Sequence, residues 1–346
     1  MELHEELFIA IDLLRSLPQQ QLLASISDHL LTLVESVIDA KVVLQNSTEW
    51  HLIIALLQSS SNGNSGSATE RVMSILHKIV KHHLSTDSLS AVLSILTTYS
   101  LSENTEALEL LVSFRTVSIE GVSSNSDMEW EVKMVPLSLK LSEICLHHSK
   151  HVRQKAIEGL SSILLENPRN DLAIFRKITF PLLENLLRPD VYKKDPTVSG
   201  MISTRSSVTN LVCKMWLLVD LTTLDQTQVE EVWLDLLDFL DRFMSSSTNS
   251  KNQNMVHESI LENLKNLVLV MNANGIISAD GSNAQAYQLY LKTVERTDLF
   301  LQGFVGEVLK DTEEPSGTQN DAPNETQTQT QPQDSPQAAQ TAVESV

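Results

Sequence analysis

The sequence contains few of the residues that build β-sheets and few that break helices. Aromatic residues make up 5% of the 346 positions, and there are 10 glycines and 10 prolines, whereas hydrophobic residues make up 42%. β-Strands are rich in aromatic and β-branched residues, while leucine-rich sequence with few glycines favours helices. A chain of this length buries about 75% of the surface of its unfolded form. The composition therefore predicts a helical protein with an ample core.

Long hydrophobic runs and a disulfide framework are also absent. The longest uninterrupted apolar run is Leu52 to Leu57, whereas a membrane-spanning helix needs roughly 20 apolar residues. Cys145 and Cys213 lie in apolar helical sequence, which indicates free buried thiols in a reducing compartment. The first residues are acidic, the wrong charge for a leader peptide. These features predict a soluble, cytosol-facing protein without a transmembrane segment.

Acidic residues exceed basic ones, with a net charge of −19, but the excess is uneven. Residues 133–214 hold 13 Lys and Arg against 7 Asp and Glu, whereas residues 215–310 hold 6 against 13. Nucleic-acid-binding proteins are normally basic overall. The sequence therefore predicts no nucleic-acid partner, and it singles out the basic middle segment.

Apolar residues recur with the helical period along most of the chain. Residues 150–165 carry one apolar stripe, formed by Val152, Ala156, Leu160, Ile163 and Leu164. Ala156 and Gly159 are small enough to let a neighbouring helix approach closely. Short polar connectors flank this segment, so helices and tight turns alternate, which is typical of an α-solenoid. We expect an all-α fold built from HEAT/armadillo-like helical hairpins. The expected helices are at 3–17, 19–44, 48–58, 70–84, 86–101, 104–114, from about 132, and at 150–165, 171–187, 202–221, 226–244 and 256–271, with one or two closing helices over 284–309. Pro181 should kink or split the helix that contains it, and Pro136 should lie in the first turn of its helix.

Breaks in this pattern suggest the domain layout. Residues 1–114 are expected to form a first sub-array of repeats, with an internal Ser/Gly/Asn-rich loop at 59–69, and residues 115–131 a seam that is either a loop or one short strand-like run. Residues 132–310 are expected to form a second sub-array. Residues 311–346 contain no aromatic residue and no Lys or Arg, so we expect a disordered tail.

The densest set of potential metal ligands is Cys145, His147, His148 and His151. Thiolate and imidazole groups are suitable zinc ligands, but no second pair of ligands has a supporting spacing, and a polar hairpin tip beside one buried cysteine is the favoured interpretation. The chain has no Gly-x-Ser-x-Gly motif, phosphate-binding loop or dinucleotide-binding motif. Acidic residues in 230–241 are interpreted as a solvated helix face. The sequence therefore predicts no catalytic residue, no metal and no cofactor.

Basic residues of the middle segment could share one surface of the stacked hairpins. Such a surface would attract anionic lipid headgroups or an acidic protein, and the alternative is a set of scattered solvated charges. The candidates are Lys150, Arg153, Lys155, Arg176, Lys177, Lys193, Lys194 and Arg205.

Five stretches in order resemble one family: TEWHLIIALL (48–57), HVRQKAIEGLSSILL (151–165), FRKITFPLLENLL (175–187), EEVWLDLLDFLDRFM (230–244) and ESILENLKNLVLVMNANGII (258–277). They are similar to the C-terminal region of the large Golgi Arf guanine-nucleotide exchange factors of the GBF/Gea type. The similarity corresponds to the second and third segments downstream of the exchange domain and extends over most of residues 1–310. The family's catalytic exchange domain has no counterpart here.

The resemblance implies a non-catalytic module for regulation or membrane targeting, peripheral at the cis-Golgi, in vesicle-mediated transport between the endoplasmic reticulum and the Golgi. Implied partners are Golgi membrane proteins or small GTPases of the Arf or Rab type, with anionic lipid as a further possibility. The alternative is a free-standing HEAT-like scaffold unrelated to Arf. The chain is expected to be either a fragment of a larger exchange factor or a truncated relative.

Overall fold

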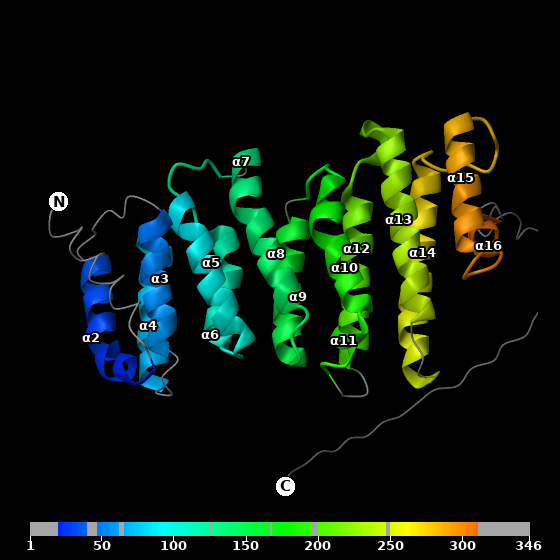
Figure 1. Cartoon of the computed structure of the whole chain (residues 1–346). Helices are drawn as coiled ribbons and strands as arrows, with labels where there is room; N and C mark the ends of the chain where they lie inside the picture. The colour runs from blue at the N-terminus through cyan, green and yellow to red at the C-terminus, as the bar shows by residue number, and fades with distance from the viewer. Residues whose placement is uncertain are drawn as a thin grey trace, which may run out of the picture.

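The computed structural model describes residues 20–39, 47–61, 66–124, 126–166, 168–195, 200–246 and 250–310. Within these ranges all regular secondary structure is helical. The helices stand side by side in two layers that follow the length of the molecule (Figure 1). The prediction of an all-α solenoid of helical hairpins is confirmed. The predicted helix at 3–17 and the predicted disordered tail at 311–346 lie outside the described residues.

Alternate helices belong to alternate layers. Layer A consists of α3 (Ser47–Ser61), α5 (Thr86–Leu101), α8 (Val135–Ile144), α10 (Phe180–Leu187), α13 (Gln226–Ser245) and α15 (Ala284–Thr297). Layer B consists of α2 (Gln20–Asp39), α4 (Gly66–His82), α6 (Thr105–Ser113), α9 (Lys150–Glu166), α12 (Gly200–Leu218), α14 (Ser250–Ala273) and α16 (Phe304–Lys310). Neighbours pack within each layer, and each A helix packs on the B helix that follows it. The apolar core therefore lies between the layers.

Short helical pieces join these helices at several places. They are η1 (Phe114–Thr116), α7 (Asp127–Glu129), η2 (Trp130–Met134), η3 (Phe175–Thr179), α11 (Pro189–Tyr192) and η4 (Leu221–Thr223). The seam predicted at 115–131 contains a short helical turn, a loop and α7, and no strand among its described residues. Since α5 packs on α8 and α6 on α9, both layers continue past it. The division into two sub-arrays stays a prediction.

The two prolines of layer A explain the two π turns. A proline has no N–H, and its ring collides with the carbonyl group four residues earlier. Ahead of Pro181, the Phe180 N–H bonds to the carbonyl of Phe175, five residues back. This widened turn is where the helix departs from α geometry at Pro181, as predicted.

Pro136 is preceded by the same arrangement, because the Val135 N–H bonds to the Trp130 carbonyl. Helical conformation begins at Asp127 rather than near residue 132. Pro136 lies in the first turn of α8, as predicted, and the π turn before it accommodates the proline ring. The predicted start was too late because residues 115–131 show no sustained period.

Local capping sets several helix ends. The Asp225 side chain accepts hydrogen bonds from the backbone N–H groups of Thr227 and Gln228 at the start of α13, which satisfies donors that have no partner inside the helix. After α14, Gly275 has a φ of 68°, a conformation that favours glycine. α14 ends at Ala273, close to the predicted end of this helix at residue 271. α3 and α4 extend into the predicted loop at 59–69, of which residues 62–65 lie outside the described residues.

Gly159 lets α9 and α6 pack closely. A Cβ atom added at Gly159 would lie 2.6 Å from Cγ2 of Val112, closer than two carbon atoms can approach. Ala156, on the same face of α9, is fully buried. The predicted close approach at these small residues is confirmed, and it fixes the position of the helix that contains three of the eight basic candidates.

Candidate functional site

Two of the eight basic candidates lie in the core rather than on a surface. Arg153 is 0% exposed and Arg205 is 2% exposed. Neither side chain can contact a lipid headgroup or a partner protein, so their assignment to an anionic-contact surface was wrong. Their guanidinium groups instead donate hydrogen bonds inside the solenoid.

Arg153 connects three parts of the chain. Its Nη2 donates to Oδ2 of Asp195 at 2.6 Å, and its Nε donates to Oγ1 of Thr204 in α12 at 2.8 Å. Its Nη1 donates to the carbonyl groups of His147 and His148 at 2.7 and 2.6 Å, in the turn between α8 and α9. Five N–H donors in a rigid planar group suit this role. Arg153 therefore holds neighbouring repeats together.

Arg205 and Lys133 act in the same way. Arg205 donates from Nε and Nη2 to the carbonyl of Leu186 at 2.9 and 2.7 Å, close to the end of α10. Lys133, 1% exposed, donates to the carbonyl of Val117 at 2.8 Å and pairs with Glu129 at 2.5 Å. Each buried cation thus supplies donors to carbonyl groups near a helix end.

The helical pattern contains a signal for these buried cations. Arg153 is four residues before Ile157 and seven before Leu160, so it lies in the same stripe as these core residues. Arg205 stands in the corresponding relation to Thr209 and Val212, which are also buried. A basic residue in phase with an apolar stripe therefore indicates a buried structural role.

Three further candidates are engaged with acidic residues of neighbouring helices. Lys155 pairs with Glu109 of α6 on layer B. On layer A, the Arg176 guanidinium lies 2.8 Å from the carboxylate of Glu231 in α13, and Lys177 lies 2.9 Å from the Glu131 carboxylate. These pairs are exposed, and each is worth about 0–1 kcal/mol.

The ion pairs continue along layer A to its last helix. Arg242 of α13 forms two hydrogen bonds with Glu184 of α10, at 2.6 and 2.8 Å. Further pairs join α15 to α13, namely Arg296 with Asp238 and Lys292 with Glu230. Of these exposed pairs, those of Lys155, Arg176 and Lys177 join the basic segment 133–214 to acidic residues of the flanking segments. The acidic residues of 230–241, interpreted as a solvated face, include partners in these pairs.

Lys150, Lys193 and Lys194 remain exposed at one edge of the solenoid. Lys150 begins α9, and the other two follow α11. The two loops are neighbours, because Lys194 donates to the carbonyl of Leu146 at 3.4 Å. Among the described residues, Lys150 and Lys193 form no ion pair. We call these three residues the basic rim. No helix in the described ranges combines the length and hydrophobicity needed to cross a bilayer.

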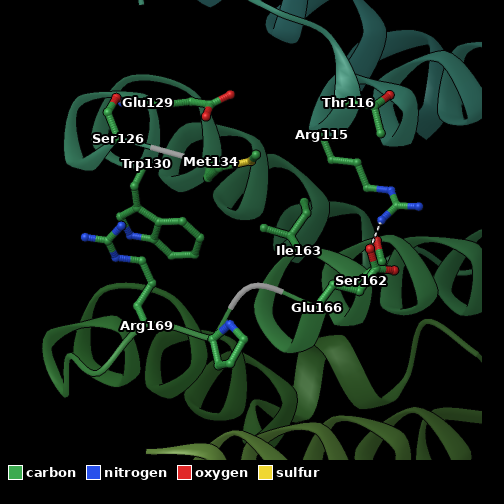
Figure 2. A pocket seen from close by; sticks show the side chains of 11 residues that line it. Arg115, Thr116, Ser126, Glu129, Trp130, Met134, Ser162, Ile163, Glu166 and Arg169 are labelled. Carbon is green, nitrogen blue, oxygen red and sulfur yellow. Dashed lines mark hydrogen bonds and ion pairs between the residues drawn. The ribbon is translucent and has the colours of Figure 1, made fainter. Parts of the chain in front are cut away.

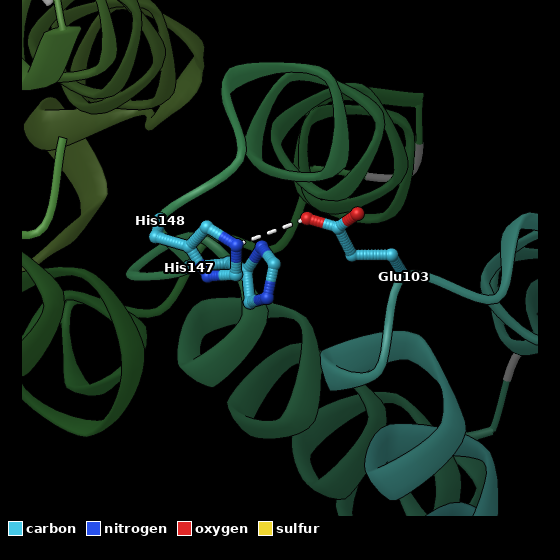
Figure 3. Close-up of side chains that lie close together, drawn as sticks. All are labelled: Glu103, His147 and His148. Atoms are coloured by element: carbon cyan, nitrogen blue, oxygen red, sulfur yellow. Dashed lines mark ion pairs between the residues drawn. The ribbon is translucent and has the colours of Figure 1, made fainter.

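The structure brings Glu103, His147 and His148 together near the same edge, as Figure 3 shows. His148 Nε2 lies 3.0 Å from the Glu103 carboxylate. His147 Nδ1 accepts from the Ser149 N–H, so Nε2 carries the proton and donates to the Leu101 carbonyl at 3.1 Å. Burial, with the nearby His148, lowers the pKa of His147 below its ordinary value. Because both its ring nitrogens are engaged, this imidazole is a structural link between α5 and α9 rather than a ready metal ligand.

The other two residues of the considered zinc set lie apart from this cluster. Cys145 is fully buried, and burial raises the pKa of its thiol far above the ordinary value. The same effect raises the pKa of Cys213 to about 12. Both thiols are therefore held in the unreactive protonated form. His151 is exposed and is not one of the three clustered residues.

Comparison with known proteins identifies the repeat region. A family model described as the GBF1-like tetratricopeptide repeat region matches residues 134–304. Residues 134–304, just under half of the chain, are thus similar to this region of GBF1-like proteins. This range contains the helices from α8 to α15, and with them Arg153, Arg205 and the basic rim. The resemblance to GBF/Gea-type exchange factors is thus confirmed for the GBF1-like region.

Two curated relatives are consistent with this match. The Golgi-specific brefeldin A-resistance guanine nucleotide exchange factor 1 homolog of Caenorhabditis elegans is 31% identical over 150 residues, which is 43% of this chain and 7% of the relative. The ARF guanine-nucleotide exchange factor GNL1 of Arabidopsis thaliana is 30% identical over 147 residues, 40% of this chain and 10% of the relative. The similarity therefore spans a tenth or less of either relative. No solved structure gives a significant match.

Proposed function

We propose that the chain acts as a regulatory and membrane-targeting region of an Arf guanine-nucleotide exchange factor, in vesicle transport between the endoplasmic reticulum and the Golgi. The match of residues 134–304 to the GBF1-like region carries this proposal, and both relatives named above are exchange factors by name. The matched part is a helical-repeat region, so its contribution is binding rather than nucleotide exchange. The proposed location is peripheral at the cis-Golgi, and the proposed partners are Golgi membrane proteins or small GTPases of the Arf or Rab type.

Affinity capture and microscopy test this function together. The tagged full chain is expected to localise at the Golgi and to recover a GTPase or membrane protein of that organelle from a membrane extract. An acidic helical-repeat protein of similar size and unrelated sequence is the control. Localisation elsewhere, with enrichment of a complex unrelated to Arf, would refute the proposal and favour the alternative of a free-standing scaffold.

We further propose that the basic rim contacts anionic lipid headgroups. Lys150, Lys193 and Lys194 are exposed on two neighbouring loops, and clustered lysines gain energy near a negatively charged membrane. The double variant Lys193→Glu/Lys194→Glu should reduce flotation with phosphatidylserine vesicles. The control variant Lys140→Glu/Lys214→Glu makes the same charge change on α8 and α12. Equal flotation of the two variants would remove the lipid contact while leaving the protein-binding proposal intact.

A further inference from the structure

A cavity of about 400 Å³ opens at the end of the repeat opposite the basic rim. Lys150 and Glu166 mark the two ends of α9, which are about 24 Å apart at 1.5 Å per residue. The cavity adjoins the Glu166 end. It lies between η1, the π turn that precedes α8, and the loop after α9 (Figure 2).

The floor of the cavity is apolar. Trp130 and Met134 of the π turn, Ile163 of α9 and Pro168 contribute apolar surface. Met134 carries a thioether side chain at this floor. A thioether side chain adapts its shape to different contacts. The cavity can therefore accept one apolar side chain, and its rim can contact the residues beside that side chain.

Two arginines flank the floor on opposite sides, as Figure 2 shows. Arg169 lies over the Trp130 ring, with Cζ 5.7 Å from the ring centroid, and it pairs with Asp127. Arg115 pairs with Glu166 on the other side. The two arginine side chains are 30% and 33% exposed, whereas the carboxylates of Asp127 and Glu166 are 88% and 55% exposed.

This asymmetry makes both guanidinium groups available to another carboxylate. Exposed ion pairs contribute little to stability, so Asp127 and Glu166 can move into water at small cost. The Arg169 guanidinium keeps its contact with the Trp130 ring, and a planar guanidinium binds a carboxylate through two parallel hydrogen bonds. Because each arginine already has an acidic partner, a simple anion gains little here. A tight ligand must also fill the apolar floor.

We propose that this cavity is a docking site for an acidic segment of a partner protein. One apolar side chain of the segment inserts between Trp130, Met134 and Ile163. Carboxylates on either side of that anchor replace Glu166 at Arg115 and Asp127 at Arg169. The partner is thus defined by an apolar residue with acidic neighbours, and the site is independent of the basic rim and of the proposed Golgi function.

Fluorescence anisotropy with a labelled nine-residue peptide tests the site on the full chain. The probe carries one phenylalanine between pairs of aspartate and glutamate residues. We expect saturable binding that weakens about tenfold or more when the phenylalanine becomes alanine, and by a similar factor when the acidic residues become amides. Absence of saturable binding, or equal affinity for the phenylalanine and alanine peptides, would overturn the proposal.

Matched variants locate the binding. Arg115→Gln/Arg169→Gln should weaken binding about tenfold or more. The control Arg176→Gln/Lys177→Gln removes the same charge from exposed pairs on layer A and should leave affinity within about twofold. Thr116→Glu is a second test if the double arginine variant does not fold, because Thr116 is an exposed lining residue and the added carboxylate repels the probe. Equal loss in the control variant, or unchanged binding with Thr116→Glu, would refute the site.

Discussion

Replacing Arg153 tests the idea that buried cations hold neighbouring repeats together. Arg153→Met keeps a long apolar side chain but removes all the guanidinium donors. Asp195, 8% exposed, then loses its guanidinium partner, and the carbonyl groups of His147 and His148 lose short hydrogen bonds. Breaking a buried ion pair from one side costs about 3–5 kcal/mol. We therefore expect the free energy of unfolding of the GBF1-like repeats to fall by about this amount.

Lys155→Met is the matched control, because Lys155 lies two residues further along α9. Its pair with Glu109 is exposed, the two side chains being 29% and 66% accessible. Removing this pair should change the unfolding free energy by about 0–1 kcal/mol. The two variants lose the same charge from the same helix. They differ because Arg153 is buried with its hydrogen bonds, whereas the pair of Lys155 is exposed to solvent.

Urea unfolding followed by circular dichroism measures both variants, and hydrogen exchange in α9 and α12 shows where stability is lost. At 1 M salt the Debye length is about 3 Å, which removes the effect of Lys155→Met but leaves most of the effect of Arg153→Met. The reasoning fails if Arg153→Met costs less than about 1 kcal/mol, or if the two variants are equally destabilised. A loss confined to helices remote from α9 would also contradict it.

Two more predictions follow from packing and protonation. Gly159→Val should lower the unfolding free energy by about 1–3 kcal/mol, because even a Cβ atom would lie 2.6 Å from Val112. Thermal unfolding compares this variant with Gly306→Ala, where no atom lies within 4 Å of the added Cβ. Equal unfolding midpoints would contradict the close packing at Gly159. The pKa of His147 is lowered in the folded state, so the unfolded chain binds the proton at a higher pH than the folded chain. The contribution of neutral His147 to the free energy of unfolding is therefore complete above about pH 6.5 and is lost as the pH falls below that value. Urea titrations between pH 7.5 and 5.5 should show this slope, and His147→Gln should flatten it.

The sequence was a good guide to the helices and to their order. The stripe of residues 150–165 predicts α9 closely, and the turn after Leu146 and the proline effect at Pro181 follow from local chemistry. Boundaries were less accurate near the Ser/Gly-rich and aperiodic segments. There, α4 begins at Gly66 rather than at residue 70, and helical structure begins at Asp127, where the Ser126 side chain caps α7. The apolar period does not reveal such starts, because the first turn of a helix can be capped locally without contributing to the core.

The candidate surface was predicted less well, because charge composition does not give a side chain's direction. Arg153 and Arg205 were grouped with exposed lysines, although their phase in the helix favours the core. The arginines of the proposed docking cavity were also missed. Arg115 and Arg169 lie in different connections between helices, with no shared local pattern, and only the stacking of repeats places them on either side of Trp130.

The sequence by itself determined the all-helical class, the alternation of helices and turns, and the uneven charge along the chain. These features depend on residues within one or two helical turns of one another. Only the tertiary structure decided which charges meet. Arg176 and Glu231 are 55 positions apart, and Arg242 and Glu184 are 58 apart, so each pair forms only when successive repeats stack. Which cations are buried, paired or left on the rim therefore depends on the angle and register of that stacking.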